Sequence, residues 1–145
     1  MANSEAQFQK ELLDSCGATQ HCHAFKVSDK FAAGRPDLYI KHLEFPSTWL
    51  ELKFGRASDK ERLAKNGFIL NLTSLQRRFL ELENDAGGVA GWALCVKVDH
   101  TWVLYAGRHH AVERVAREHF VQIRTIGQNW SIGALLSHLH QQEES

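Results

Sequence analysis

Two acidic residues and a lysine lie in two neighbouring stretches that we predict to be β-strands. Asp37 opens the stretch that continues to Lys41, and Glu51 and Lys53 lie two positions apart in the stretch 48–54. Successive strand side chains point to opposite faces, so Glu51 and Lys53 share one face, where Asp37 can join them. Two carboxylates and an ammonium group at one point can bind a hard divalent cation and activate a water molecule. The structural alternative is a turn-ending Asp37 beside a solvated ion pair.

The residues around this group occur in a recognisable order. The segment 34–37 reads Gly-Arg-Pro-Asp before the first strand, and 50–53 in the second strand reads apolar-Glu-apolar-Lys. The segment 72–76 then opens a helix that ends at 86–88, Ala-Gly-Gly. This order resembles the PD-(D/E)XK nuclease superfamily, in particular its archaeal-type Holliday-junction resolvases, VRR-NUC domains and small phage-encoded nucleases. The resemblance covers about the first hundred residues.

The resemblance implies both a fold and an activity. The fold is expected to be α/β, with a restriction-endonuclease-like core in which helices flank a mixed central β-sheet in the order αβββαβ. The activity is expected to be metal-dependent endonucleolytic hydrolysis of DNA phosphodiester bonds. Branched or four-way-junction DNA is the substrate that the resolvase-like branch suggests.

The oxygen-rich residues favour Mg²⁺ or Mn²⁺ over softer metals. By analogy with the family, Asp37 and Glu51 would bind the ion together with the backbone carbonyl of Leu52. These nucleases also carry an acidic residue on the first helix that reaches the metal. Glu5 matches that residue by its spacing from the glycine that ends the helix, and Glu11 is the alternative. Glu5 also has a purely structural explanation, as a favourable negative charge in a first helical turn.

Lys53 and Gln76 are expected to act beside the ion. Lys53 would orient or deprotonate the water and offset the charge of the phosphate. Thr73 and Gln76 match a capping box, which is a complete structural explanation for the glutamine. The resemblance additionally gives a glutamine at this place a role near the attacking water or the phosphate, and both roles can hold together.

Basic residues are concentrated between positions 53 and 78, although the chain has 17 basic and 17 acidic residues. A net charge of zero argues against a protein that coats nucleic acid electrostatically. A basic patch beside an acidic metal site nevertheless suits a phosphodiester substrate, although a solvated loop has the same composition. The residues predicted to contact nucleic acid are Lys30, Arg35, Arg56, Lys60, Arg62, Lys65 and Arg77.

DNA is the expected partner. The resemblance to resolvases, which act as symmetric dimers, implies a homodimer, and the lack of an evident added targeting domain fits this expectation. The apolar residues proposed for the dimer contact are Ile132, Leu135, Leu136 and Leu139. Trp92, Trp102 and Trp130 are predicted to lie in the core or in a dimer contact. Two other hypotheses remain open. The same fold could be a catalytically inactive module that only binds nucleic acid, or the motif could be a coincidence in a structural subunit.

Length and composition predict one soluble domain, with a core over residues 4–105 and an extension over 106–145. No apolar run approaches the roughly 20 residues of a membrane helix, so we expect a cytoplasmic protein (host cytoplasm if phage-encoded) without membrane partners. Three cysteines without a CxxC pair indicate a reduced compartment. His21-Cys22-His23 is not expected to bind zinc, because adjacent strand residues cannot all face one metal. No organic cofactor is expected.

Hydrophobic periodicity and turn residues predict the elements. The buried apolar face of the second helix, which packs on the sheet, is predicted to consist of Leu75, Phe79, Leu80 and Leu82. The predicted helices are 5–16, 73–86, 110–119 and 130–140, and the predicted strands are 21–27, 37–41, 48–54, 91–98, 101–105 and 120–126, with a turn at 44–47 and a polar connection at 55–71.

Overall fold

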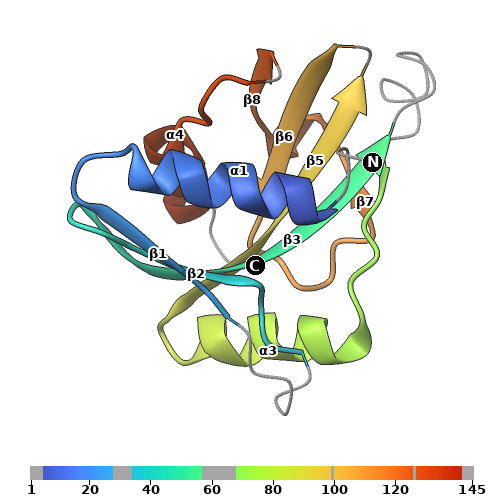
Figure 1. The fold of residues 1–145 in the computed structure, drawn as a ribbon. Coiled ribbons are helices and arrows are strands. Elements are labelled where there is room, and N and C mark those ends of the chain that lie inside the picture. The colour runs from blue at the N-terminus through green and yellow to red at the C-terminus, as the bar shows by residue number, and fades with distance from the viewer. Residues whose placement is uncertain (1–4, 28–33, 57–67, 99, 126, 142–145) are drawn as a thin grey trace.

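The structure is a computed structural model, and it describes residues 5–27, 34–56, 68–98, 100–125 and 127–141. A six-stranded sheet with the order β1-β2-β3-β5-β6-β8 runs through the molecule, beside a two-stranded sheet of β4 and β7 (Figure 1). β3 and β5 are parallel, whereas the other pairs in the large sheet are antiparallel. The strands are β1 (Cys22–Lys26), β2 (Leu38–His42), β3 (Phe45–Arg56), β4 (Phe68–Ile69), β5 (Val89–Val98), β6 (Thr101–Gly107), β7 (Arg114–Val115) and β8 (Phe120–Thr125).

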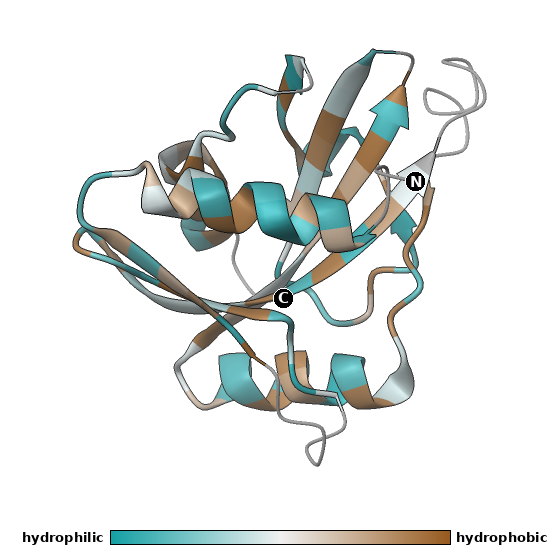
Figure 2. Ribbon diagram, viewed as in Figure 1, coloured by the Kyte–Doolittle hydropathy of each residue, from teal (hydrophilic) through white to brown (hydrophobic). Residues whose placement is uncertain are grey.

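Helices cover both faces of the large sheet. Figure 1 shows α1 (Glu5–Gly17) and α4 (Ile132–Gln141) on one face and α3 (Ser74–Asp85) on the other. A short 3₁₀ helix, η1 (Arg117–His119), precedes β8. In Figure 2, teal and brown segments alternate along α1 and α3, as expected for helices with one face on a sheet. The predicted fold class, mixed α/β with helices flanking the sheet, is confirmed, and the order αβββαβ is present as α1-β1-β2-β3-α3-β5.

Two hydrophobic cores result from the two helical layers. Leu50 and Leu52 of β3 lie in the core beneath α1 and α4. The second core lies on the α3 side and contains Leu80, Trp92 and Leu94. β5 contributes to both, because nine of its ten residues are buried, as expected for a central strand with a parallel neighbour. Glu51, between Leu50 and Leu52, therefore faces the α3 side.

The predicted capping box begins α3. Thr73 Oγ1 accepts a hydrogen bond from the Gln76 backbone N–H (3.1 Å), and Gln76 Oε1 accepts one from the Thr73 backbone N–H (2.9 Å). The helix ends at Asp85, and Gly87 follows with φ at +90°, a conformation that glycine adopts without steric cost. This segment connects the parallel strands β3 and β5 and places Gln76 at the first turn of α3.

The predicted helix over 110–119 is wrong. The segment forms β7 and the single turn η1, and Val115 pairs with Phe68 of β4. The guanidinium of Arg77 binds the carbonyl oxygens of His110 and Val112, which holds the segment in a non-helical conformation. Periodicity could not reveal this tertiary contact.

The turn predicted at 44–47 is also wrong, since β3 begins at Phe45 and includes Pro46. His42 pairs with Phe45, so the hairpin turns at Leu43 and Glu44. The Glu44 N–H donates to His42 Nδ1 (3.0 Å) and stabilises the tight connection. The polar connection predicted at 55–71 likewise contains strand structure, because β3 continues to Arg56 and β4 follows.

Several predicted packing roles differ in the structure. Leu80 is buried and Phe79 packs on the second core, but Leu75 and Leu82 are 56% and 50% exposed. The three tryptophans Trp92, Trp102 and Trp130 are buried, which confirms their predicted place in the core. The four residues proposed for a dimer contact are all buried in the first core, so that prediction is wrong: Ile132, Leu135, Leu136 and Leu139.

No helix among the described residues is both long enough and apolar enough to cross a bilayer.

Candidate active site

Asp37 is the residue immediately before β2. Beyond this point β3 continues, but β2 no longer pairs with it. β2 begins at Leu38, opposite Leu50, while β3 extends on to Arg56. Asp37 Oδ2 accepts a hydrogen bond from the Leu52 backbone N–H (2.8 Å), in the place of a further ladder bond. The N–H and C=O of a strand residue point to the same edge, so the Leu52 carbonyl is also directed to the edge that Asp37 occupies.

The residues before Asp37 determine how the chain enters this position. Gly34 has φ at +87°, and a Cβ on it would lie 2.6 Å from the carbonyl oxygen of Leu75. Only glycine fits this close approach to the start of α3. Pro36 is buried and restricts its own φ. The Gly-x-Pro-Asp segment thus brings the Asp37 carboxylate to β3 and the first turn of α3.

Glu51 is 4% exposed, an unusual burial for a carboxylate. Its Oε2 accepts a hydrogen bond from Gln76 Nε2 (2.9 Å) and lies 3.7 Å from Lys53 Nζ. Its Oε1 is buried and accepts no hydrogen bond within the part of the chain that the structure describes, and the protonated form of Glu51 hydrogen-bonds to Asp37. Burial, and then the neighbouring Asp37 carboxylate, raise the pKa of Glu51 from its ordinary value to about 8, against the charge of Lys53.

Glu5 belongs to the same group of charges, and Glu11 does not. Partial burial and then the charge of Asp37 raise the pKa of Glu5, while Lys53 lowers it. Glu5 therefore lies close enough to both groups to interact with them electrostatically. Glu11 instead forms a buried ion pair with Arg124. Of the two helix carboxylates considered from the sequence, the structure directs Glu5 towards the candidate site.

The donors at this site fit a hard divalent cation. The buried Oε1 of Glu51, the nearby Asp37 carboxylate and the Leu52 carbonyl are all oxygen donors, which Mg²⁺ and Mn²⁺ prefer. No group of three His, Cys, Asp or Glu side chains in the described ranges is arranged to hold a metal. Mg²⁺ commonly binds through one or two carboxylates and keeps several waters, so a two-carboxylate site suits it.

The predicted nucleic-acid contacts are placed only in part. Arg35 is exposed two residues before Asp37, and Arg56 is the last residue of β3. Both therefore come from segments that also supply candidate site residues. The remaining lysines and the arginine of the connection lie outside the described residues: Lys30, Lys60, Arg62 and Lys65.

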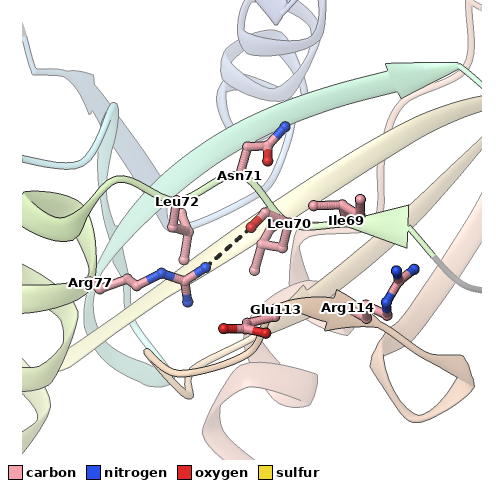
Figure 3. Close-up of a pocket in the computed structure, with 7 residues that line it drawn as sticks. All are labelled: Ile69, Leu70, Asn71, Leu72, Arg77, Glu113 and Arg114. Atoms are coloured by element: carbon pink, nitrogen blue, oxygen red, sulfur yellow. Dashed lines mark hydrogen bonds between the residues drawn. The ribbon is translucent and has the colours of Figure 1, made fainter.

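Arg77 has a structural role that differs from the predicted contact with nucleic acid. Its guanidinium donates to the carbonyl oxygens of His110 (2.6 Å), Val112 (2.8 Å) and Leu70 (3.2 Å). Three of its five N–H donors are thus used by carbonyls, which tie α3 to the β4 and β7 segments. Figure 3 shows Arg77 directed to Leu70 at a cavity of about 300 Å³ between those segments. The lining residues are Ile69, Leu70, Asn71, Leu72, Arg77, Glu113 and Arg114, and none is a candidate catalytic residue.

Sequence reasoning missed that Tyr39 and Trp49 lie beside this site. Trp49 shares a face of β3 with Glu51, and Tyr39 pairs with Trp49 across β2 and β3. The strand alternation that groups Glu51 with Lys53 contains this information, since Trp49 has the same parity. Whether a helix covers the aromatic side chains is not encoded in that alternation.

Sequence comparisons identify no relative of this chain, and a structural comparison finds a similar fold. No family model matches the chain, and no curated protein matches its sequence. Among solved structures, Hjc, a Holliday junction resolvase from the archaeal hyperthermophile Archaeoglobus fulgidus, is similar, with 16% identity and a TM-score of 0.41 over 69% of this chain and 70% of that chain. A similarity at this level does not establish a shared family or activity.

Proposed function

We propose that this protein is a nuclease of the PD-(D/E)XK type that hydrolyses phosphodiester bonds in DNA with bound Mg²⁺ or Mn²⁺. The observation that carries the proposal is the buried Glu51, whose Oε1 accepts no hydrogen bond from the described residues and which lies beside Asp37 and Lys53. Burying a carboxylate beside a second carboxylate is costly for stability. Such a cost is understandable where the oxygen serves a bound cation.

Asp37 and Glu51 would hold the ion, with the Leu52 carbonyl as a further donor and Glu5 acting directly or through water. When bound, the ion supplies charge neutralisation at the phosphate and a bound water of lowered pKa. Gln76 fixes Glu51 through its hydrogen bond to Oε2, which leaves Oε1 free for coordination. In this proposal Gln76 holds Oε2 of Glu51, and Oε1 would be the oxygen that binds the ion.

Lys53 lies next to Glu51 on the same face and keeps partial access to solvent. Its ammonium group can donate hydrogen bonds to a non-bridging phosphate oxygen and can orient the attacking water. A positive charge there also offsets the negative charge that develops on the phosphate in the transition state. Lys53 is therefore the residue to which we assign electrostatic stabilisation.

The test is cleavage of matched linear, flapped, single-stranded and four-way-junction DNA with Mg²⁺ or Mn²⁺. Asp37→Asn and Lys53→Met should lose activity by at least about 100-fold, the size of effect known for removing one preorganised charge-stabilising group. Asp14→Asn is the matched control, because Asp14 is an exposed carboxylate ion-paired to Lys10 on α1. Wild-type rates in Asp37→Asn would contradict the assignment.

The same experiment separates the proposal from a binding module that lacks catalysis. A wild-type protein that binds these DNAs but cuts none of them with either ion would be such a module. A symmetric dimer remains a prediction, and its contact would have to use residues other than the buried apolar residues of α4.

A further inference from the structure

Aromatic residues occupy paired positions across three strands and continue onto α3. Phe25 of β1 pairs with Tyr39 of β2, and Tyr39 pairs with Trp49 of β3. The Tyr39 and Trp49 ring centroids are 4.5 Å apart, and Trp49 meets Phe79 of α3 at 5.4 Å. His23 extends the row, at 4.4 Å from Phe25. We call these five residues, His23, Phe25, Tyr39, Trp49 and Phe79, the aromatic stripe.

The aromatic stripe lies on the same sheet face as the candidate site. Trp49 is two residues before Glu51 on β3, so their side chains project to one face. Two residues of a strand span about 6.6 Å, and the two strand spacings from β3 to β1 add about 10 Å across the sheet. A nucleic acid strand that leaves the site across β2 and β1 would therefore contact the aromatic stripe immediately next to the site.

The outer part of the stripe is accessible. Phe25 is 44% exposed, and Tyr39 is half-buried. α1 and α4 pack on the opposite face, against Leu38 and other apolar residues of the same strands. Trp49 and Phe79 pack on the second core, which holds the inner end of the stripe rigid. A rigid inner end and an exposed outer end are what a stacking surface requires.

One lysine lies beside the outer part of the stripe. In β1 and β2, with the sequences CHAFK and LYIKH, Lys41 and His23 share the face of Phe25 and Tyr39, whereas Lys26 and His42 have the parity of the residues that pack on the first core. Lys41 Nζ lies 6.0 Å from the centroid of the Tyr39 ring, and Lys41 pairs with His23 across the strands. Cationic groups beside aromatic faces suit a phosphate backbone whose bases are unpaired.

We propose that the aromatic stripe binds unpaired nucleotides of the DNA substrate by stacking their bases on Phe25 and Tyr39, with Trp49 supporting Tyr39 from the inner end. This inference rests on the proposed nuclease function and narrows its substrate to DNA with a single-stranded segment next to the scissile phosphate. A paired base is already stacked within its duplex and cannot use the stripe. The stripe therefore distinguishes single-stranded and flapped DNA from continuous duplex.

The binding test uses fluorescence anisotropy with a fluorescein-labelled single strand and with its duplex, in EDTA to prevent cleavage. Phe25→Ala should weaken single-strand binding by about 5- to 150-fold, the effect of removing one aromatic stacking partner. Phe25→Leu, which keeps apolar bulk without an aromatic face, should lose a similar factor, whereas Phe25→Trp should restore binding. Duplex binding should stay within about twofold in all three variants.

Phe120→Ala is the matched control. Phe120 is 46% exposed on β8, at the opposite edge of the sheet from Phe25, so the same substitution removes a similar side chain away from the stripe. Its single-strand affinity should equal that of the wild type. Circular dichroism of each variant verifies that the fold is retained.

The outcomes separate this inference from the proposed function. Equal single-strand affinity in wild type, Phe25→Ala and Phe120→Ala overturns the stacking surface, even if the protein cleaves duplex DNA with Mg²⁺. Loss of single-strand binding in Phe25→Ala alone supports the surface, even if no DNA is cleaved, in which case the nuclease assignment fails by itself. Absence of binding to any DNA by the wild type overturns both.

Discussion

Replacing Glu51 with Gln should stabilise the folded protein while it removes cation binding. The pKa of this carboxyl rises from 4.5 to about 8 on folding, mainly through burial and then through Asp37. At pH 7 the unfolded chain carries an ionised Glu51, and folding must therefore bind a proton. The 2.5 pH units between 4.5 and 7, at 1.36 kcal/mol each, cost about 3 kcal/mol.

Glutamine avoids this cost and keeps most of the local contacts. Its side chain has the same size, and its carbonyl oxygen can still accept the hydrogen bond from Gln76 Nε2. The folded carboxyl is protonated at pH 7, so the substitution removes no charge attraction to Lys53. The variant should therefore gain about 3 kcal/mol of unfolding free energy at pH 7, or about 9 °C in melting temperature for a chain of this size.

Thermal unfolding in EDTA and in Mg²⁺ measures both effects. In EDTA the melting temperature of Glu51→Gln should exceed that of the wild type. The difference should shrink as the pH falls from 8 towards 4.5, since in this window the folded wild type binds more protons than its unfolded chain and so loses stability as the pH rises. Added Mg²⁺ should raise only the wild-type melting temperature, by mass action on the folded state.

Two results would refute this reasoning. One is a Glu51→Gln variant that is less stable than the wild type in EDTA at pH 7, since Glu51 would then carry a stabilising charge. The other is an equal response of both proteins to Mg²⁺, since Glu51 would then not be a ligand. Glu118→Gln, a change at an exposed carboxylate in η1, controls for the loss of one negative charge.

Two further predictions concern residues that stabilise the fold around the site. Arg77→Met should destabilise the protein by about 2–4 kcal/mol in urea titrations, because three carbonyl oxygens lose a charged donor; a change within about 0.5 kcal/mol would show that water replaces it. Glu11→Ala should cost about 3–5 kcal/mol by the same measurement, because it leaves the buried Arg124 guanidinium without its counter-charge. The exposed Lys10–Asp14 pair on the same helix is the comparison, where Asp14→Ala should cost about 1 kcal/mol or less.

Much of the local structure could be read from the sequence. The alternation through Leu50, Glu51, Leu52 and Lys53 correctly separates the residues of the first core from those that face the candidate site, because it depends only on strand geometry. It does not reveal that α3 and a second core cover the face of Glu51. The capping box of Thr73 and Gln76 also follows from local chemistry. Such features depend on residues close together in the chain, so pattern and spacing are sufficient to predict them.

Contacts between residues distant in the chain determine which apolar residues are buried and which segments are helical. Leu75 and Leu82 have the periodicity of buried residues, yet they are exposed, while the apolar face of α4 that suggested a dimer lies in the core. Arg77 reaches carbonyls more than thirty residues away, and this contact replaces a predicted helix with extended chain. No local pattern contains the partner of such a side chain.

The candidate site combines both kinds of information. The sequence by itself supplied the carboxylates, the lysine and the strand faces that carry them. Only the tertiary structure decided that β2 begins at Leu38, so that Asp37 reaches the Leu52 N–H, and that Glu51 is buried with an Oε1 that accepts no hydrogen bond from the described residues. The physical reason is that burial and proximity, which raise the pKa of Glu51, are properties of packing between segments distant in the chain.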